Sequence, residues 1–136
     1  MKKNGHNIDV VAAIIVDGEK MLCVRRGKGK HDYTSYKYEF PGGKMEEGES
    51  REEALIREIS EELGIGIEVD RFFMVTTYSY PDFTITLHAF ICKIVQGEVV
   101  LSEHTEYKWL LPQELKSVAW TGADKEIVEA LSKTKP

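Results

Sequence analysis

The chain has few cysteines and no long apolar run, and each shortage excludes a class of protein. Two cysteines among 136 residues cannot build the disulfide framework of a small secreted domain. Cys23 and Cys92 have neither the spacing of a redox pair nor that of a zinc ligand set, so we expect two buried, reduced thiols. No segment reaches the length of a membrane-spanning helix, and the first nine residues lack the apolar stretch of a secretory signal. These absences favour a cytoplasmic protein without membrane contact.

Basic residues are also fewer than acidic ones. The sequence has 18 lysines and arginines against 23 aspartates and glutamates, a formal net charge of −5. This balance argues against non-specific binding to a nucleic acid polymer or to an anionic membrane. A small nucleotide substrate is still compatible with it, because a divalent cation and local basic residues can offset the acids. The sequence leaves the oligomeric state open.

The composition is that of one folded unit. With 42% hydrophobic and 30% charged residues, the chain fits a globular domain with one core. It contains no internal repeat, low-complexity block or interdomain linker, so we expect residues 1–136 to form a single domain. Apolar segments and turn residues predict a mixed sheet with two main helices. We expect strands over 8–16, 20–26, 67–80, 83–95, 99–101 and 107–111, helices over 50–63 and 121–131, and a single helical turn at 112–115.

The helix expected over 50–63 has clear end signals. Ser50 and Glu53 have the spacing of a capping box, and Gly64 stands where a left-handed C-terminal cap belongs. At about 100° per residue, one face of this helix is apolar. We expect this face, with Leu55, Ile56, Ile59 and Leu63, to be buried.

A second face of the same helix is acidic. Glu58, Glu61 and Glu62 follow the spacing i, i+3 and i+4, at which like charges cost an isolated helix a few tenths of a kcal/mol per pair. These carboxylates flank the apolar face rather than oppose it. Because carboxylate oxygens are the ligands that Mg²⁺ and Mn²⁺ prefer, the cluster predicts a metal site.

The surrounding motif resembles a known family. From Gly43 to Ile65 the sequence reads GKMEEGESREEALIREISEELGI, and it matches the Nudix box in full. The matching positions are Gly43, Glu49, Arg57, Glu58, Ile59, Glu61, Glu62, Gly64 and Ile65. The resemblance extends over almost the whole chain and implies the Nudix fold, an α/β/α sandwich in which a mixed β-sheet lies between helices. Within the family the chain is similar to the MutT-like branch and to bacterial CTP pyrophosphohydrolases.

The resemblance also implies roles for individual residues. The metal ligands would be the carbonyl of Gly42 and the carboxylates of Glu58, Glu61 and Glu62, while Gly43, Glu49, Arg57 and Gly64 would support the box. MutT-like enzymes place a further carboxylate before a tryptophan strand, as metal ligand or general base, and Glu103 stands before Trp109 with five residues between them. Glu61, Glu62 and Glu103 are therefore the expected catalytic residues. The sequence does not decide whether Glu62 or Glu103 is the general base.

Substrate contacts are expected from four positions. The guanidinium of Arg26 suits a phosphate or a base, and Lys44 lies in the turn that leads into the box. Phe40 offers a stacking surface, although an aromatic residue on a strand can equally belong to the core. Asp124 matches the position at which MutT-like proteins bind the nucleobase, yet it also fits an N-cap of the last helix. Glu39 could help to hold a metal-bound water network or be simply a strand-end carboxylate, and it is left out of the predicted site.

The resemblance implies Mg²⁺-dependent hydrolysis, with Mn²⁺ as the other candidate ion. The expected substrate is a nucleoside triphosphate, either CTP or dCTP or an oxidised dGTP, and the products are a nucleoside monophosphate and pyrophosphate. Two alternatives remain open: hydrolysis of ADP-ribose or a dinucleoside polyphosphate, and a non-catalytic domain that senses nucleotides. The complete set of box glutamates favours an enzyme.

Overall fold

The computed structural model describes residues 6–133, which form seven strands, two α-helices and two short 3₁₀ helices. The strands are β1 (His6–Asp17), β2 (Lys20–Arg25), β3 (Tyr38–Glu39), β4 (Gly42–Lys44), β5 (Gly66–Ser79), β6 (Phe83–Gln96) and β7 (Glu106–Leu110). The helices are α1 (Arg51–Leu63), η1 (Pro112–Ser117), η2 (Gly122–Asp124) and α2 (Lys125–Ser132). Within this range no helix is both long and apolar enough to cross a membrane.

Strand β1 joins two groups of strands. Over most of its length it pairs in parallel with β6, which forms an antiparallel hairpin with β5. The end of β1 pairs with β2, and β2 in turn pairs with β3 and β7. Every residue from Val11 to Ile15 is buried, because β1 is covered on both faces. The single parallel pair makes the sheet mixed, as the sequence predicts.

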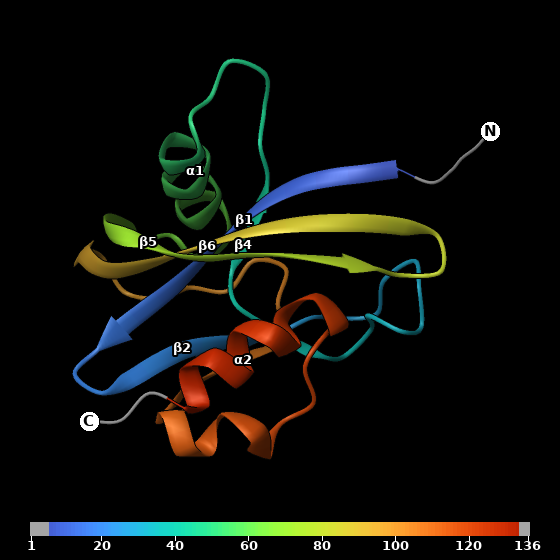
Figure 1. Cartoon of the computed structure of the whole chain (residues 1–136). Helices are drawn as coiled ribbons and strands as arrows, with labels where there is room; N and C mark the ends of the chain where they lie inside the picture. The colour runs from blue at the N-terminus through green and yellow to red at the C-terminus, as the bar shows by residue number, and fades with distance from the viewer. Residues whose placement is uncertain (1–5, 134–136) are drawn as a thin grey trace.

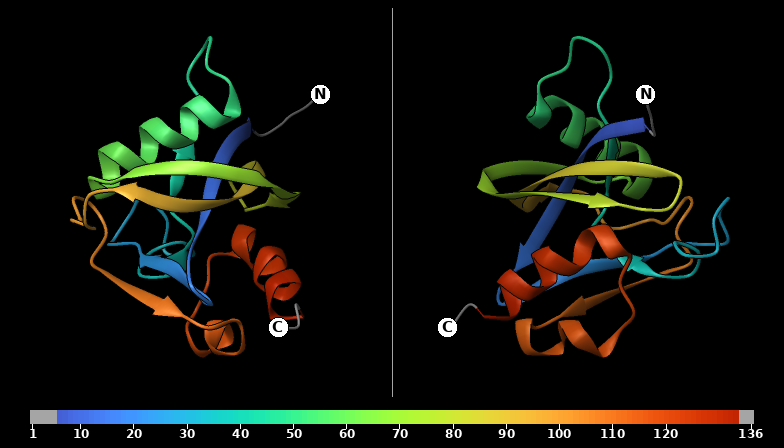
Figure 2. Two further views of the ribbon diagram at one scale, coloured as in Figure 1. Left: turned by 90° about the vertical axis from the view of Figure 1, so that its left-hand side faces the viewer. Right: turned by 45° about the vertical axis from the view of Figure 1, so that its right-hand side comes forward.

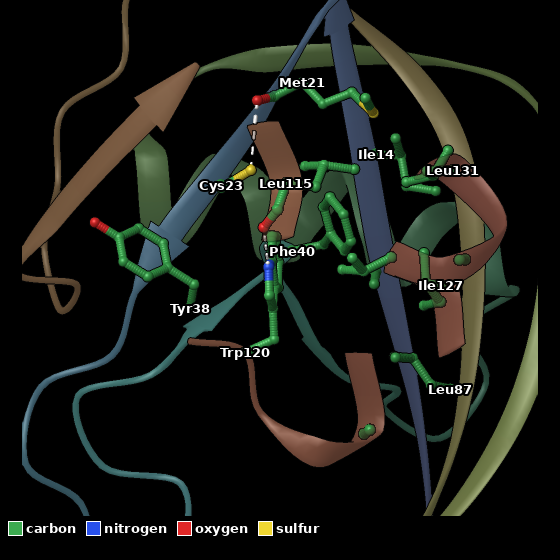
Figure 3. Close-up of a cluster of buried hydrophobic side chains, with 14 of the residues drawn as sticks. Ile14, Met21, Cys23, Tyr38, Phe40, Leu87, Leu115, Trp120, Ile127 and Leu131 are labelled. Carbon is green, nitrogen blue, oxygen red and sulfur yellow. Dashed lines mark hydrogen bonds between the residues drawn. The ribbon is translucent and has the colours of Figure 1, made fainter. Parts of the chain in front are cut away.

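The two α-helices cover opposite faces of the sheet formed by β1, β6 and β5. Figures 1 and 2 show α1 on one side of these strands and α2 on the other, next to β2. Each face has its own group of buried side chains. One includes Leu55, Ile59 and Leu63 of α1, and the other, drawn in Figure 3, includes Phe40, Trp120 and Ile127. This arrangement is the expected α/β/α sandwich.

Helix α1 has the expected ends but buries a different set of residues. Ser50 and Glu53 form both bonds of the capping box, and Gly64 ends the helix with a φ of 68°. Ile56, predicted to be buried, is 42% exposed. The side chains that face the sheet follow an i, i+4, i+8 line from Leu55, and Ile56 lies one step of 100° beyond that line. Ala54 is buried instead.

Two further segments differ from the sequence prediction. Residues 99–101 form no strand; the amide of Val100 donates to the carbonyl of Leu63 and so satisfies the end of α1 rather than a strand partner. The predicted helix over 121–131 is divided, since η2 precedes α2 and the α-helix begins only at Lys125. Cys23 and Cys92 are buried and free, as expected.

Candidate active site

A cavity of about 790 Å³ lies where β1, the β3–β4 connection, the end of α1 and η2 meet. Most of the predicted site residues line it, although they come from distant parts of the sequence. These are Arg26, Phe40, Gly42, Gly43, Lys44, Glu62, Glu103 and Asp124. Glu58 and Glu61 are not among the lining residues. The structure therefore brings together residues of the predicted metal-binding and substrate-binding ends, whereas two of the three helix carboxylates lie outside the lining.

The three box glutamates of α1 have different surroundings. Glu62 faces the cavity, and its Oε1 atom is buried without a hydrogen-bond partner. The side chain of Glu58 is only 16% exposed and lies against Gly43. Glu61 is 61% exposed and pairs with Arg57 at 3.2 Å. Only Glu62 thus points an unsatisfied oxygen toward the site.

Arg57 braces this end of the helix, as predicted from the box. Its Nε and Nη2 atoms donate to Glu49 at 2.6 and 3.0 Å, and Nη2 also donates to the carbonyl of Lys44 at 3.1 Å. The hydrogen bond from Arg57 is the main cause that lowers the pKa of Glu49. The guanidinium therefore ties α1 to strand β4 and to the loop before the helix, which fixes the carboxylates relative to the glycines.

Gly42 and Gly43 are required by close approach rather than by backbone conformation. A Cβ atom at Gly42 would lie 1.9 Å from the carbonyl oxygen of Val11, the neighbouring strand's backbone. A Cβ atom at Gly43 would lie 2.4 Å from the carboxyl carbon of Glu58. Gly42 thus allows β4 to lie against β1, and Gly43 leaves space for a carboxylate of α1.

Carboxylates converge on Glu62. The pKa of this side chain is raised to about 8, first by burial and then by the negative charges of Glu39, Glu58 and Glu103. Burial without compensation and repulsion between like charges both disfavour the ionised form. A divalent cation would remove both costs, so the unpartnered oxygen of Glu62 and its acidic neighbours fit such an ion. Among the described residues, no three potential ligands already stand together as a preformed metal site.

The sequence interpretation left Glu39 out of the site and gave His104 no role of its own. Glu39 accepts hydrogen bonds from Arg26 at 3.2 Å and from His104 at 3.0 Å, and both residues line the cavity. Glu39 also raises the pKa of Glu62 and of Asp124, so its carboxylate acts on both ends of the cavity. The available signal was the position of Glu39, three residues before Gly42 and next to buried Phe40.

The other end of the cavity is formed by Phe40 and Asp124. Asp124 is 4% exposed, and its two oxygens accept from the amide of Phe40 at 2.9 Å and the hydroxyl of Thr121 at 2.7 Å. Its side chain makes no capping bond to α2. Burial, followed by the charge of Glu39, raises the pKa of Asp124 to about 7. Phe40 belongs to the core, where its ring is tilted by 32° against that of Trp120, and it also lines the cavity.

A basic loop lines part of the cavity. Lys28, Lys30 and His31 line it, and the loop reaches the β5–β6 turn through Asp82. The hydroxyl of Tyr33 donates to Asp82 at 2.6 Å. Arg26, as predicted, faces the cavity, whereas Arg25 turns away and binds the carbonyl of Tyr36. The cavity lining therefore includes cationic groups as well as the carboxylate of Glu62 at the end of α1.

Comparison with known proteins gives one family. The NUDIX domain family matches residues 6–131. An 8-oxo-dGTP diphosphatase of Buchnera aphidicola subsp. Schizaphis graminum is 33% identical over 125 residues, which cover 92% of this chain and 93% of that protein. A CTP pyrophosphohydrolase of Escherichia coli is 35% identical over 123 residues, which cover 90% of each chain.

Solved structures agree in fold. The solution structure of the E. coli ORF135 protein has a TM-score of 0.82 at 33% identity, covering 97% of this chain and 95% of that chain. The crystal structure of a MutT protein from Methanosarcina mazei has a TM-score of 0.84 at 24% identity, covering 96% of each chain. At that identity the second likeness shows the fold alone.

Proposed function

This chain belongs to the Nudix family, and we propose that it hydrolyses a nucleoside triphosphate to a nucleoside monophosphate and pyrophosphate. The observation that carries the proposal is the surroundings of Glu62. Its buried, unpartnered oxygen and the charges of Glu39, Glu58 and Glu103 form an acidic centre at the edge of the cavity. Arg26 and the basic loop lie on the same cavity and can neutralise phosphates. This combination suits a phosphoanhydride better than a neutral ligand.

Nudix hydrolases in general use a divalent metal, and we propose Mg²⁺, with Mn²⁺ as a substitute. The ion would be held by the carbonyl of Gly42 and by Glu58, Glu61, Glu62 and Glu103. When bound, it would neutralise charge on the phosphates and lower the pKa of a water molecule. The acidic cluster supplies hard oxygen ligands, while Arg57 and Glu49 keep the helix in place behind them.

We assign the proton-accepting role to Glu103. Its side chain is exposed, lines the cavity, and makes no hydrogen bond or ion pair with any residue from 6 to 133. A general base must lie within hydrogen-bond reach of the attacking water and accept its proton. A carboxylate that makes no other hydrogen bond is free to do both. Glu62, with one oxygen buried, is better suited to hold the ion. Arg26 and Lys44 would bind the phosphates of the substrate.

The base would lie at the end formed by Phe40 and Asp124. Each oxygen of Asp124 already accepts one protein donor, and a carboxylate oxygen can accept a second. An ionised Asp124 would therefore accept a hydrogen bond from an exocyclic amine such as that of cytosine. This supports CTP or dCTP as substrate; the 8-oxo-dGTP diphosphatase among the relatives makes oxidised dGTP the competing candidate.

A substrate panel tests the proposal. The purified protein would be given Mg²⁺ and CTP, dCTP, dGTP, 8-oxo-dGTP, ADP-ribose or diadenosine tetraphosphate, with pyrophosphate and orthophosphate measured separately. We expect pyrophosphate from one of the triphosphates. Turnover of ADP-ribose or the dinucleotide alone would overturn the substrate class, and no turnover of any compound would indicate a nucleotide-sensing domain.

A matched pair of variants tests the carboxylate assignment. Glu61→Gln removes one charge from the box, and we expect it to lower turnover about 100-fold or more with the fold intact. Glu68→Gln makes the same chemical change on β5, where Glu68 pairs with Lys93 on the surface outside the cavity. It should turn over at the unaltered rate. Equal rates for both variants would remove Glu61 from the metal ligands.

A further inference from the structure

The position of Glu103 is not fixed by its own side chain. This carboxylate has no hydrogen bond or ion pair within the described part of the chain, and it belongs to a segment, 97–105, without helix or strand. A functional group on an irregular segment needs other contacts to hold it, because a misplacement of about 1 Å can cost about 100-fold in rate. The residues on either side of Glu103 supply such contacts.

Ser102 attaches the segment to the end of α1. Its hydroxyl donates to the carbonyl of Glu62 at 3.1 Å, and two residues earlier the amide of Val100 donates to the carbonyl of Leu63 at 2.9 Å. Both acceptors belong to the last turn of the helix, where carbonyls have no partner within the helix. Glu103 therefore follows directly after a bond to the backbone of Glu62, the residue whose carboxylate faces the cavity.

His104 attaches the other side. Its imidazole is 7% exposed, and its Nε2 atom lies 3.0 Å from Oε2 of Glu39, whereas its buried Nδ1 atom has no partner. An ionised carboxylate can only accept, so the Nε2–H group donates to Glu39. The next residue, Thr105, donates its amide to the carbonyl of Arg25 at 2.9 Å. Glu103 thus stands between an anchor on α1 and an anchor on the strands that carry Glu39 and Arg25.

We propose that Ser102 and His104 are positioning residues, which hold Glu103 beside Glu62 so that both carboxylates serve the same cation and water. The proposal rests on the proposed hydrolysis and extends it: both residues act through Glu103 rather than through a substrate contact of their own. Their removal should impair the chemical step and cation binding more than nucleotide binding. They should matter little once Glu103 can no longer act.

A double-mutant cycle tests this dependence. His104→Leu removes the donor, whereas His104→Gln keeps an N–H group near the position of Nε2. We expect His104→Leu to lower kcat about 10-fold or more with KM changed less than about 2-fold, and His104→Gln to recover most of the loss. In a Glu103→Gln background, His104→Leu should cost less than about 2-fold more. Equal losses in both backgrounds would overturn the proposal.

Ser102→Ala provides a second cycle through the other anchor, and it removes only one hydroxyl from an exposed residue. It keeps the proposal testable if His104→Leu does not fold, as judged by circular dichroism and the thermal midpoint. We expect a smaller loss of kcat than for His104→Leu, again absent in the Glu103→Gln background. An undiminished kcat for Ser102→Ala would remove Ser102 from the positioning pair.

The same double-mutant cycle can be measured without turnover, through the affinity of each variant for Mn²⁺. Electron paramagnetic resonance measures the concentration of free Mn²⁺. We expect His104→Leu to weaken Mn²⁺ binding about 10-fold when Glu103 is present, but not in the Glu103→Gln background. A wild-type protein that binds Mn²⁺ yet releases no pyrophosphate would refute the proposed function and leave this cycle readable. Mn²⁺ binding unaffected by His104→Leu would refute the positioning role.

Discussion

At the scale of single residues, Gly42 and Gly43 are adjacent but exclude a side chain for different reasons. A methyl group at Gly42 would meet the backbone of Val11, whereas one at Gly43 would meet the carboxylate of Glu58, which is the movable end of a side chain. We expect Gly42→Ala to lower the free energy of unfolding by about 3 kcal/mol or more, since two strands must separate. Gly43→Ala should cost about 1 kcal/mol and instead displace Glu58.

Urea unfolding and a Mg²⁺ titration of activity separate the two effects. Gly43→Ala should need more Mg²⁺ for half-maximal activity while keeping most of its stability. If Gly43→Ala and Gly42→Ala lost stability equally and the Mg²⁺ requirement did not change, Glu58 would not depend on Gly43 for its position. Gly48→Ala is unsuitable as a control, because its φ of 87° brings strain of its own.

Asp124 gives a prediction about pH. Its pKa is raised to about 7 from 3.8. Between about pH 4 and pH 7 the folded protein holds a proton that the unfolded chain has released, so this group makes the free energy of unfolding fall as pH rises through that window. Asp124→Asn abolishes the titration, and its amide oxygen can still accept from Phe40. We expect the variant to be more stable than wild type at about pH 8, by a few kcal/mol, and the difference to shrink toward about pH 5.

Urea unfolding of both proteins at several pH values measures this difference, and Asp17→Asn is a matched control, because Asp17 is exposed at the end of β1 and outside the cavity. A constant difference between Asp124→Asn and wild type across the range would show that Asp124 is ionised in the folded protein throughout. The same variant also tests the base contact. If an ionised Asp124 binds the exocyclic amine of cytosine, the ratio of kcat/KM for CTP over that for the other triphosphates should fall.

At the scale of elements, α1 has two ends with separate tasks. Its first turn is stabilised by the Ser50 and Glu53 capping box, far along the helix from Glu62. We expect Ser50→Ala to lower the free energy of unfolding by about 1 kcal/mol, because the amide of Glu53 loses its partner. Ser60→Ala is the control, since Ser60 is exposed on the same helix. Neither change should alter kcat; a loss of kcat in Ser50→Ala would mean that the cap also positions the carboxylates.

The elements most fully predicted from sequence are those with local signals. The ends of α1 follow from Ser50 and Gly64, and the buried strand β1 follows from its β-branched run, since each depends on neighbours along the chain. The exposed position of Ile56 could not be predicted from the same pattern, because two adjacent apolar residues compete for one face and the sheet decides between them. Residues 99–101 have strand-like composition, yet Val100 binds the end of α1, a contact between distant segments.

The residues of the candidate site also fall into those with a local sequence signal and those that depend on contacts between distant segments. The box residues were found because their spacing is local, and Glu103 because it precedes Trp109 at a fixed distance. The bond between Glu39 and His104 could not be predicted, because each residue has an ordinary local context and the two are 65 positions apart. Asp124 was left between two roles until the fold placed its carboxylate against Phe40 rather than against the amides of α2.

At the scale of the whole molecule, the carboxylates around Glu62 that we propose for function lower the stability of the fold. Glu62 is partly buried among like charges, so the protein without a cation carries an uncompensated cost. The formal net charge of −5 adds general repulsion that any salt can screen. Specific binding and screening can be told apart, because only the former depends on Glu62.

We therefore expect about 5 mM MgCl₂ to raise the thermal midpoint by a few degrees, and about 15 mM NaCl, which has the same ionic strength, to raise it much less. Glu62→Gln should be more stable than wild type without divalent cation, because the neutral amide neither takes up a proton on folding nor buries a charge among the other carboxylates. It should gain little from MgCl₂. Differential scanning calorimetry of both proteins in both salts measures these four values. If the two salts stabilised wild type equally, the carboxylates would act only as general surface charge. If Glu62→Gln gained as much from MgCl₂ as wild type, the ion would bind elsewhere.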